Sequence, residues 1–421
     1  TATSAALFLP AGQLPAVGEM VRNRDLAATL RKMVEAEQSA LKRGASRAGA
    51  LQAAHDRFYK GDIAAEIARY FRDNGGILSA ADLAAFAARW ETPLHTTYRG
   101  YDVYSNGSSS RGGFEVLMQL NLVEGFDLAA MKAGSAEAIH VQAEAIKVAK
   151  SDIYKYVADP AFTKIPAAGM LSKAYARERR KLIDPRRAAA YPEAGNPGAF
   201  MTATVAANPP PSSAGPTWPE RYDPDPETTS FSIVDRDGNA VAVTPTIGGG
   251  MGTGVVVGNT GMLFNNGLRL GSTAPYPDNV NYARAGQIPL LNNSPVIVLK
   301  DGQLVLAIGT PGGETIGQTQ FQGIVNVLDF GMTIQAAIEA PRFRVDPEPN
   351  FYKPGAAMTI AIERRAAAAA IKGLQSLGHS VELLPEFTAG VGGMQGILID
   401  LKTRTMTAGA DPRRAGYAIG F

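Results

Sequence analysis

The chain has 421 residues, enough to bury a large core as one layered domain or as two or three smaller ones. Its 41 Lys and Arg residues nearly balance 39 Asp and Glu residues, so the net charge of +2 gives no reason to expect nucleic acid or an anionic membrane as a partner. The chain contains no cysteine, which excludes disulfides, thiolate nucleophiles and cysteine-bound zinc. Any chemistry must therefore use oxygen, nitrogen or the backbone, and we expect it to act on small molecules.

The first part of the chain predicts mainly helices. Apolar residues recur at helical spacing from Arg24 to about Phe86, and Ser79 is a suitable N-cap for the last helix of this run. Further helices are expected around 113–124 and 136–157. No apolar run reaches the roughly 20 residues that span a bilayer, and the first residues lack the basic segment of a signal peptide.

The four histidines give no metal-binding pattern. They are far apart in the predicted elements, and none belongs to an HExxH motif or to an i, i+4 pair of histidines. They are His55, His95, His140 and His379. We therefore expect packing or surface histidines and no metal site.

A segment rich in proline, serine and aspartate, residues 195–227, interrupts the helical pattern. Its composition is typical of an exposed, partly extended linker, where a chain is readily cut. After this segment the apolar period changes from about 3.6 to two. We therefore predict two polypeptide parts, residues 1–194 and 228–421, that share one fold.

Three hairpins are predicted in the second part, and two of them have Asp-Gly turns. Their sequences are SFSIVDRDGNAVAVTPT, SPVIVLKDGQLVLAIGT and GILIDLKTRTMTAGA. Helical segments separate them, including TIGQTQFQGIVNVLDFG and IERRAAAAAIKGLQSLGH. Hairpins that alternate with helices imply stacked antiparallel sheets covered by helices, which is a layered α+β architecture.

Two threonines, Thr228 and Thr229, open the first hairpin directly after the linker. Most Thr-Thr pairs simply begin a strand. A Thr hydroxyl becomes a nucleophile only when a base takes its proton, and an α-amine, with a pKa of roughly 7.7–8.0, is suited to that role. The α-amine becomes available only if the bond before the threonine is cut, and the linker makes such a cut plausible.

The segment TTSFSIVDRDGNAVAVTPTIGGGMGTGVVVGNTGMLFNN resembles the head of the small subunit of γ-glutamyltransferases, which are N-terminal-nucleophile hydrolases. Matches also follow in order along the chain, among them FYKGDIAAEIARYFRDNGG, AEAIKVAKSDIYKYVADPAF, NSPVIVLKDGQ, GTPGGETI and ADPRRAGYAIG. The resemblance covers nearly the whole chain. It implies a four-layer αββα sandwich with a helical N-terminal part, and it implies that the family's opening helices and first strands would precede Thr1.

The resemblance also implies a set of catalytic residues. Thr228 would be the nucleophile, released by cleavage of the Glu227–Thr228 bond, and its free α-amine would be the base. Thr246 matches a second threonine that binds the nucleophile by a hydrogen bond. Gly312 and Gly313 match the pair whose backbone N–H groups form an oxyanion hole. The two parts of the chain would then be large and small subunits made from one precursor.

The positions that hold a glutamyl substrate in the family differ in this chain. Gly248 replaces an Asn, and Leu291 with Asn292 replaces a tandem Ser. Arg269 and Leu270 replace an acidic pair, so an α-ammonium group would lose its carboxylate partner. This pattern argues against glutamyl substrates and favours the amidohydrolase and acylase branches of the family.

Two arginines are candidates for binding a substrate carboxylate. Arg111 stands where the family has a Ser, and Arg269 replaces an acid. An arginine in a surface loop is the alternative interpretation for either of them. Together with Asn292 and Gly248 they form the predicted substrate-binding set.

The leading hypothesis is an autoprocessed amide hydrolase that acts through an acyl-enzyme on a small amide, without a cofactor. One alternative is a γ-glutamyltransferase or glutathione hydrolase proper. Another is an uncleaved, inactive relative that serves as a binding protein. The compartment is expected to be periplasmic or cytoplasmic, and the former is favoured.

Overall fold

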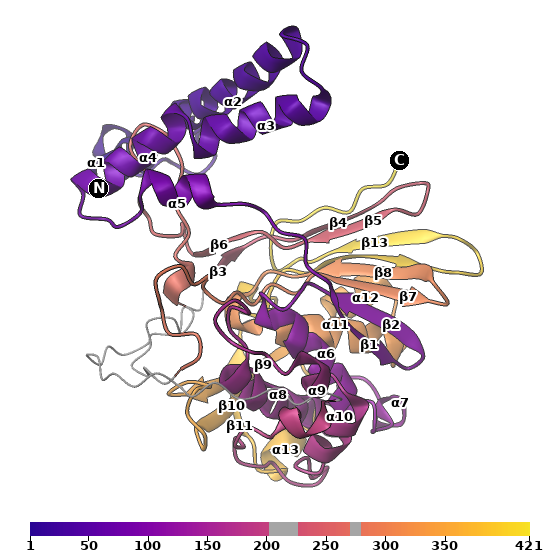
Figure 1. Cartoon of the computed structure of the whole chain (residues 1–421). Helices are drawn as coiled ribbons and strands as arrows, with labels where there is room; N and C mark the ends of the chain where they lie inside the picture. Colours follow the sequence, from indigo (N-terminus) through magenta and orange to yellow (C-terminus); the bar gives the residue numbers. More distant parts are fainter. Residues whose placement is uncertain (202–225, 270–278) are drawn as a thin grey trace. The chain divides into compact units, whose positions relative to one another are not determined.

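The computed structural model describes residues 1–201, 226–269 and 279–421, and it leaves the side chains of residues 226, 227 and 269 undescribed. Within this range the chain forms two compact units (Figure 1). One consists of Thr1–Trp90 with Gly249–Asn266, and the other of Glu91–Gly248 with Gly267–Phe421. Most of the predicted linker, residues 202–225, lies outside the described residues.

The smaller unit is helical. Its elements are α1 (Ala2–Phe8), 3₁₀ helix η1 (Pro10–Gly12), α2 (Arg24–Lys42), α3 (Arg47–Tyr59), α4 (Asp62–Asp73) and α5 (Ala80–Ala85). The predicted cap of α5 is confirmed, because the Ser79 hydroxyl accepts from the Asp82 backbone N–H and the Asp82 carboxylate accepts in return from the Ser79 N–H. Ile63, Ile67 and Val257 form a small core of this unit.

A six-stranded antiparallel sheet is the centre of the larger unit. Its strand order is β1-β2-β7-β8-β12-β13. The strands are β1 (Leu94–Tyr98), β2 (Tyr101–Ser105), β7 (Val296–Lys300), β8 (Gln303–Gly309), β12 (Gln395–Ile399) and β13 (Met406–Ala410). The first two strands precede the linker and the other four follow it, so both parts of the chain build one sheet.

Helices cover one face of this sheet, and a hairpin packs on the other (Figure 1). The hairpin is β4 (Phe231–Val234) with β5 (Ala240–Val243), as the Asp-Gly turn predicted. The helices on the sheet are α6 (Arg111–Val123), α11 (Ile316–Leu328) and α12 (Ile334–Glu339). Four more helices pack on α6 or on one another, namely α7 (Leu128–Met131), α8 (Ala136–Tyr156), α9 (Ala167–Met170) and α10 (Lys173–Arg180). Every residue of α6 is buried, including the polar Arg111, Glu115, Gln119 and Asn121, so these side chains need partners inside the protein.

The remaining elements are short. A two-stranded ladder joins β3 (Pro226–Thr228) to β6 (Thr246–Gly249). The 3₁₀ helices are η2 (Pro197–Phe200), η3 (Gly267–Arg269), η4 (Gly313–Thr315) and η5 (Ala389–Val391). In the described ranges, no helix combines the length and the hydropathy needed to cross a membrane.

A three-stranded sheet in the second part differs from the sequence analysis. It consists of β9 (Phe343–Glu348), β10 (Ala357–Glu363) and β11 (Ser380–Leu384), with β10 in the middle. The helix predicted to begin at Ile362 begins only at Ala368, as α13 (Ala368–Ser376). Ile362 instead lies in β10 and pairs with Phe343, because pairing in the sheet overrides the helical preference of the alanine run that follows.

Two histidines that were expected to lie far apart are in contact, which corrects that prediction. His140 Nδ1 lies 2.7 Å from His379 Nε2, and His140 Nε2 donates to the Asp184 carbonyl at 2.8 Å. The Glu144 carboxylate is close to both rings, and Lys147 Nζ lies 2.5 Å from its Oε1. The cluster holds α8 against the residue that precedes β11, across 239 positions of sequence.

The buried His379 generates a prediction about acid stability. Burial, with Lys147 and His140 nearby, lowers the pKa of His379 to about 3 from 6.5. Below pH 6.5 the histidine is protonated in the unfolded chain, but in the folded chain it stays neutral until the pH approaches 3. The free energy of unfolding should therefore decrease as the pH falls from 6.5 towards 3. In His379→Gln, the free energy of unfolding in urea should fall less over this window than in the wild type.

The exposed His95 provides the matched control, because it lies on β1 and pairs with Asp102 at the surface. In His95→Gln, the loss of stability that is assigned to His379 should remain. Parallel curves for His379→Gln and wild type would contradict the assignment of this acid destabilisation to His379.

Candidate active site

Thr228 and Thr246 lie side by side on the β3–β6 ladder. The Thr228 Oγ1 is 2.9 Å from the Thr246 Oγ1, and the Gly248 backbone N–H donates to the same Thr246 oxygen at 2.9 Å. Gly248 has a φ of +97°, a conformation that favours glycine. Thr228 is buried, while Thr229, the residue after β3, is exposed.

A glycine loop after β8 lies against β3. Gly312 has a φ of +145° and Gly313 a φ of +57°, and a Cβ on Gly312 would come within 2.6 Å of Thr315 Oγ1. Only glycine fits the first position without a shift of its neighbours. The Gly312 carbonyl accepts from the Thr315 N–H at 3.1 Å and from its hydroxyl at 2.8 Å.

Two predicted substrate-binding residues lie beside this loop and bind groups of the chain itself. Asn292 is buried, and its amide donates to the Gly313 carbonyl. Arg111 is the first residue of α6, is 1% exposed and forms an ion pair with Glu314. The alternative interpretation of Arg111 as a surface-loop residue is therefore wrong.

The other predicted positions are only partly described. Arg269 ends η3, and its side chain lies outside the described part of the structure, as does the whole of Leu270. Glu227 lies in β3, directly before Thr228, but its side chain is also undescribed. The structure thus brings Thr228, Thr246 and the glycine loop together and leaves Arg269 unplaced with respect to them.

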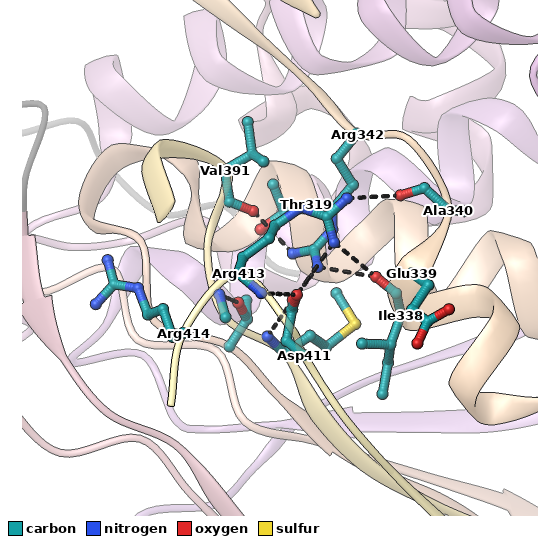
Figure 2. Close-up of polar contacts among 12 residues, drawn as sticks. Thr319, Ile338, Glu339, Ala340, Arg342, Val391, Asp411, Arg413 and Arg414 are labelled. Atoms are coloured by element: carbon teal, nitrogen blue, oxygen red, sulfur yellow. Dashed lines mark hydrogen bonds and ion pairs between the residues drawn. The ribbon is translucent and has the colours of Figure 1, made fainter. Parts of the chain in front are cut away.

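The sequence analysis did not single out Arg414, which reaches the first threonine. Its Nη1 donates to the Thr228 carbonyl at 3.5 Å, and its Nη2 donates to the Ala389 carbonyl at 3.4 Å. The motif ADPRRAGYAIG was the available signal, because it places two consecutive arginines near the end of the chain. In Figure 2 the Arg414 guanidinium points away from the cluster that its neighbour Arg413 joins.

That cluster is a buried set of ion pairs centred on Asp411 (Figure 2). Asp411 pairs with Arg342 and with Arg413, and it also accepts from the Met394 backbone N–H at 2.8 Å. Burial alone would raise the pKa of Asp411, but the two guanidinium groups outweigh burial and lower it. The carboxylate therefore stays ionised and holds the segment before β12 in place.

This segment also reaches the glycine loop. Arg342 Nη1 donates to the Val391 carbonyl at 2.8 Å, and the Gly393 N–H donates to Thr310 Oγ1 at 3.2 Å. A Cβ on Gly392 would lie 2.5 Å from that same Thr310 oxygen. The ion pairs around Asp411 thus fix the surroundings of the loop from the C-terminal side.

Other features lie away from these residues. A cavity of about 680 Å³ opens at the far end of β7 and β8, where Tyr101, Lys300 and Met332 line it. Its lining contains none of the predicted catalytic residues. Among the described residues, the one group of three potential metal ligands is His140, Glu144 and His379, whose atoms have the protein partners given above.

Comparisons with known proteins agree with this arrangement. The sequence model of the family described as Gamma-glutamyltranspeptidase matches residues 1–421. The glutathione hydrolase proenzyme of Escherichia coli is 35% identical over 375 residues, which are 86% of this chain and 59% of the relative. The Acylase ACY 1 proenzyme of Pseudomonas sp. (strain SE83) is 30% identical over 387 residues, which are 92% of this chain and 60% of the relative.

A solved structure supports the same relationship. The crystal structure of a cephalosporin acylase from Bacillus halodurans matches with a TM-score of 0.78 at 27% identity, and the match covers 98% of this chain and 65% of that chain. The likeness confirms the predicted α+β fold. The chain spans about three fifths of the two sequence relatives described above. From the family match over its whole length and from these relatives, the chain belongs to the gamma-glutamyltranspeptidase family.

Proposed function

We propose that this chain contains the catalytic centre of an autoprocessed amide hydrolase whose nucleophile is Thr228. The observation that carries the proposal is the 2.9 Å contact between the Thr228 and Thr246 hydroxyl oxygens, on a strand that lies against the Gly312–Gly313 loop. An acyl-transfer site needs a nucleophile, a base and donors for a developing oxyanion. Thr228 would supply the first two after cleavage, and the loop would supply the third.

Self-cleavage would come first. The Thr228 hydroxyl attacks the Glu227 carbonyl carbon, the C–N bond breaks, and the acyl group moves to the Thr228 oxygen as an ester. The leaving nitrogen takes a proton and becomes the α-amine of Thr228. Water then hydrolyses the ester, which frees the hydroxyl and leaves Glu227 with a carboxylate. Arg414 binds the Thr228 carbonyl and would keep the new terminus in place.

Amide hydrolysis would follow at the same oxygen. The neutral α-amine of Thr228 takes the hydroxyl proton as the oxygen attacks the substrate carbonyl, and it later donates a proton to the leaving amine. The Gly248 N–H already donates to Thr246 Oγ1, so the Thr246 hydroxyl proton is suited to point at Thr228 Oγ1 and stabilise it. Water releases the acid from the acyl-enzyme, and no cofactor takes part in these steps.

The substrate is proposed to be an amide of an acid without a free α-amino group. Arg269 and Leu270 replace the acidic pair that would bind an α-ammonium group, and Leu291 replaces a Ser. A relative named as an acylase and a structural neighbour named as a cephalosporin acylase support this choice. The relatives named as glutathione hydrolases favour γ-glutamyl transfer or hydrolysis as the second candidate.

The nucleophile assignment predicts the behaviour of two adjacent threonines. The protein should separate into two fragments between Glu227 and Thr228, and Thr228→Ala should abolish both cleavage and activity, because the hydroxyl and the amine belong to one residue. Thr229→Ala is the matched control, since Thr229 is exposed. Intact-mass measurement reports cleavage, and an uncleaved wild type with full activity would refute the assignment.

The substrate assignment predicts a preference between two anilides that differ by one group. Glutaryl p-nitroanilide lacks the α-amine of γ-glutamyl p-nitroanilide and is otherwise the same acyl group. The kcat/KM should be at least about tenfold higher for the glutaryl compound, a difference of about 1.4 kcal/mol in transition-state binding. A tenfold preference for the γ-glutamyl compound would instead support the second candidate.

A further inference from the structure

The carboxylate that Arg111 binds in this structure belongs to Glu314, the residue next to the glycine loop. Arg111 Nη2 pairs with Glu314 Oε1, and the guanidinium lies 4.7 Å from the centre of the Tyr154 ring. The Tyr154 hydroxyl donates to the other oxygen of Glu314 at 2.5 Å. Both oxygens of this carboxylate are therefore occupied by groups from α6 and α8.

A second buried ion pair lies beside the first. Lys150 is fully buried on α8, and its Nζ lies 2.9 Å from Glu115 Oε1 on α6. The same nitrogen donates to the Glu314 backbone carbonyl at 3.2 Å and lies 3.5 Å from Glu314 Oε2. Two cations thus face two carboxylates, and removal of any one member leaves a buried charge without compensation.

Hydrogen bonds hold three consecutive peptide groups of the loop, and Lys150 of the buried ion pair makes one of them. The Gly312 carbonyl accepts from Thr315, the Gly313 carbonyl accepts from Asn292, and the Glu314 carbonyl accepts from Lys150. The peptide bond is planar, so a fixed carbonyl also fixes the direction of the N–H on the next residue. The N–H of Gly313 therefore has one orientation, set by its neighbours.

We propose that Arg111, Lys150 and Glu314 are positioning residues that fix the oxyanion loop for acyl transfer. The inference rests on the proposed function and deepens it, because it assigns Arg111 a role in the catalytic step instead of in binding a substrate carboxylate. Oxyanion donors act only when they are aimed at the transition state. Loss of the ion pair should therefore lower kcat and leave KM nearly unchanged.

The test compares an anionic and a neutral substrate, glutaryl and pentanoyl p-nitroanilide, in wild type, Arg111→Met, Glu314→Gln and the double variant. Loop positioning predicts that Arg111→Met loses at least about tenfold in kcat with both substrates, since loss of one oxyanion donor costs about 10²–10³. The double variant should recover thermal stability, because no unpaired charge remains, but it should not recover kcat.

Arg99→Met is the control, because Arg99 forms a partly buried ion pair with Asp329 at 2.9 Å and contacts no residue of the loop in the described structure. It should keep the kcat of the wild type. If Arg111→Met does not fold, Arg111→Lys takes its place. Lysine keeps the positive charge but lacks the planar guanidinium group, so this variant should show a smaller loss of kcat on both substrates.

Three results would overturn the inference. A rise in KM confined to the glutaryl compound would show that Arg111 binds the substrate carboxylate. An unchanged kcat in a folded Arg111→Met or Arg111→Lys variant would show that the ion pair has no part in positioning. If the wild type neither cleaves itself nor hydrolyses either anilide, the proposed function fails and the inference fails with it.

Discussion

The candidate site depends on ion pairs that are buried on two sides of the glycine loop. On the C-terminal side, Asp411 forms ion pairs with the guanidinium groups of Arg342 and Arg413. On the opposite side, Glu314 forms an ion pair with Arg111. A buried ion costs several kcal/mol unless a partner of opposite charge and hydrogen bonds compensate it. Such pairs are costly to move, and this rigidity is what a loop with positive φ angles needs if its N–H groups are to keep one direction.

Much of the fold could be predicted from the sequence because its signals are local. The Asp-Gly turn of β4–β5 and the cap at Ser79 depend on residues a few positions apart. The pairing of Arg111 with Glu314 joins positions 203 apart, and that of His140 with His379 joins positions 239 apart. No periodicity or spacing in a single sequence reports such contacts.

In the candidate site, too, some residues could be predicted from local motifs, while contacts between distant positions could not. Thr228 with Thr246 and the glycine pair could be named from ordered motifs, and the structure places them on β3, β6 and the loop before α11. The partners of Arg111 and Asn292 could not be named, because each side chain can bind either a substrate or the protein itself. Only the fold decides between these uses, and in the described residues both side chains bind the protein.

The six-stranded sheet contains strands from both sides of the linker, and this would affect the stability of the protein after cleavage. Strands β1 and β2 precede the proposed cleavage point, and β2 pairs with β7, which follows it. Before cleavage the fold forms from one chain at any dilution. After cleavage the same sheet would be an interface between two chains, so unfolding would become dissociation and its equilibrium would depend on protein concentration. Two separated fragments would have to associate again in order to refold. The lifetime of the cleaved protein would therefore depend on a low unfolding rate.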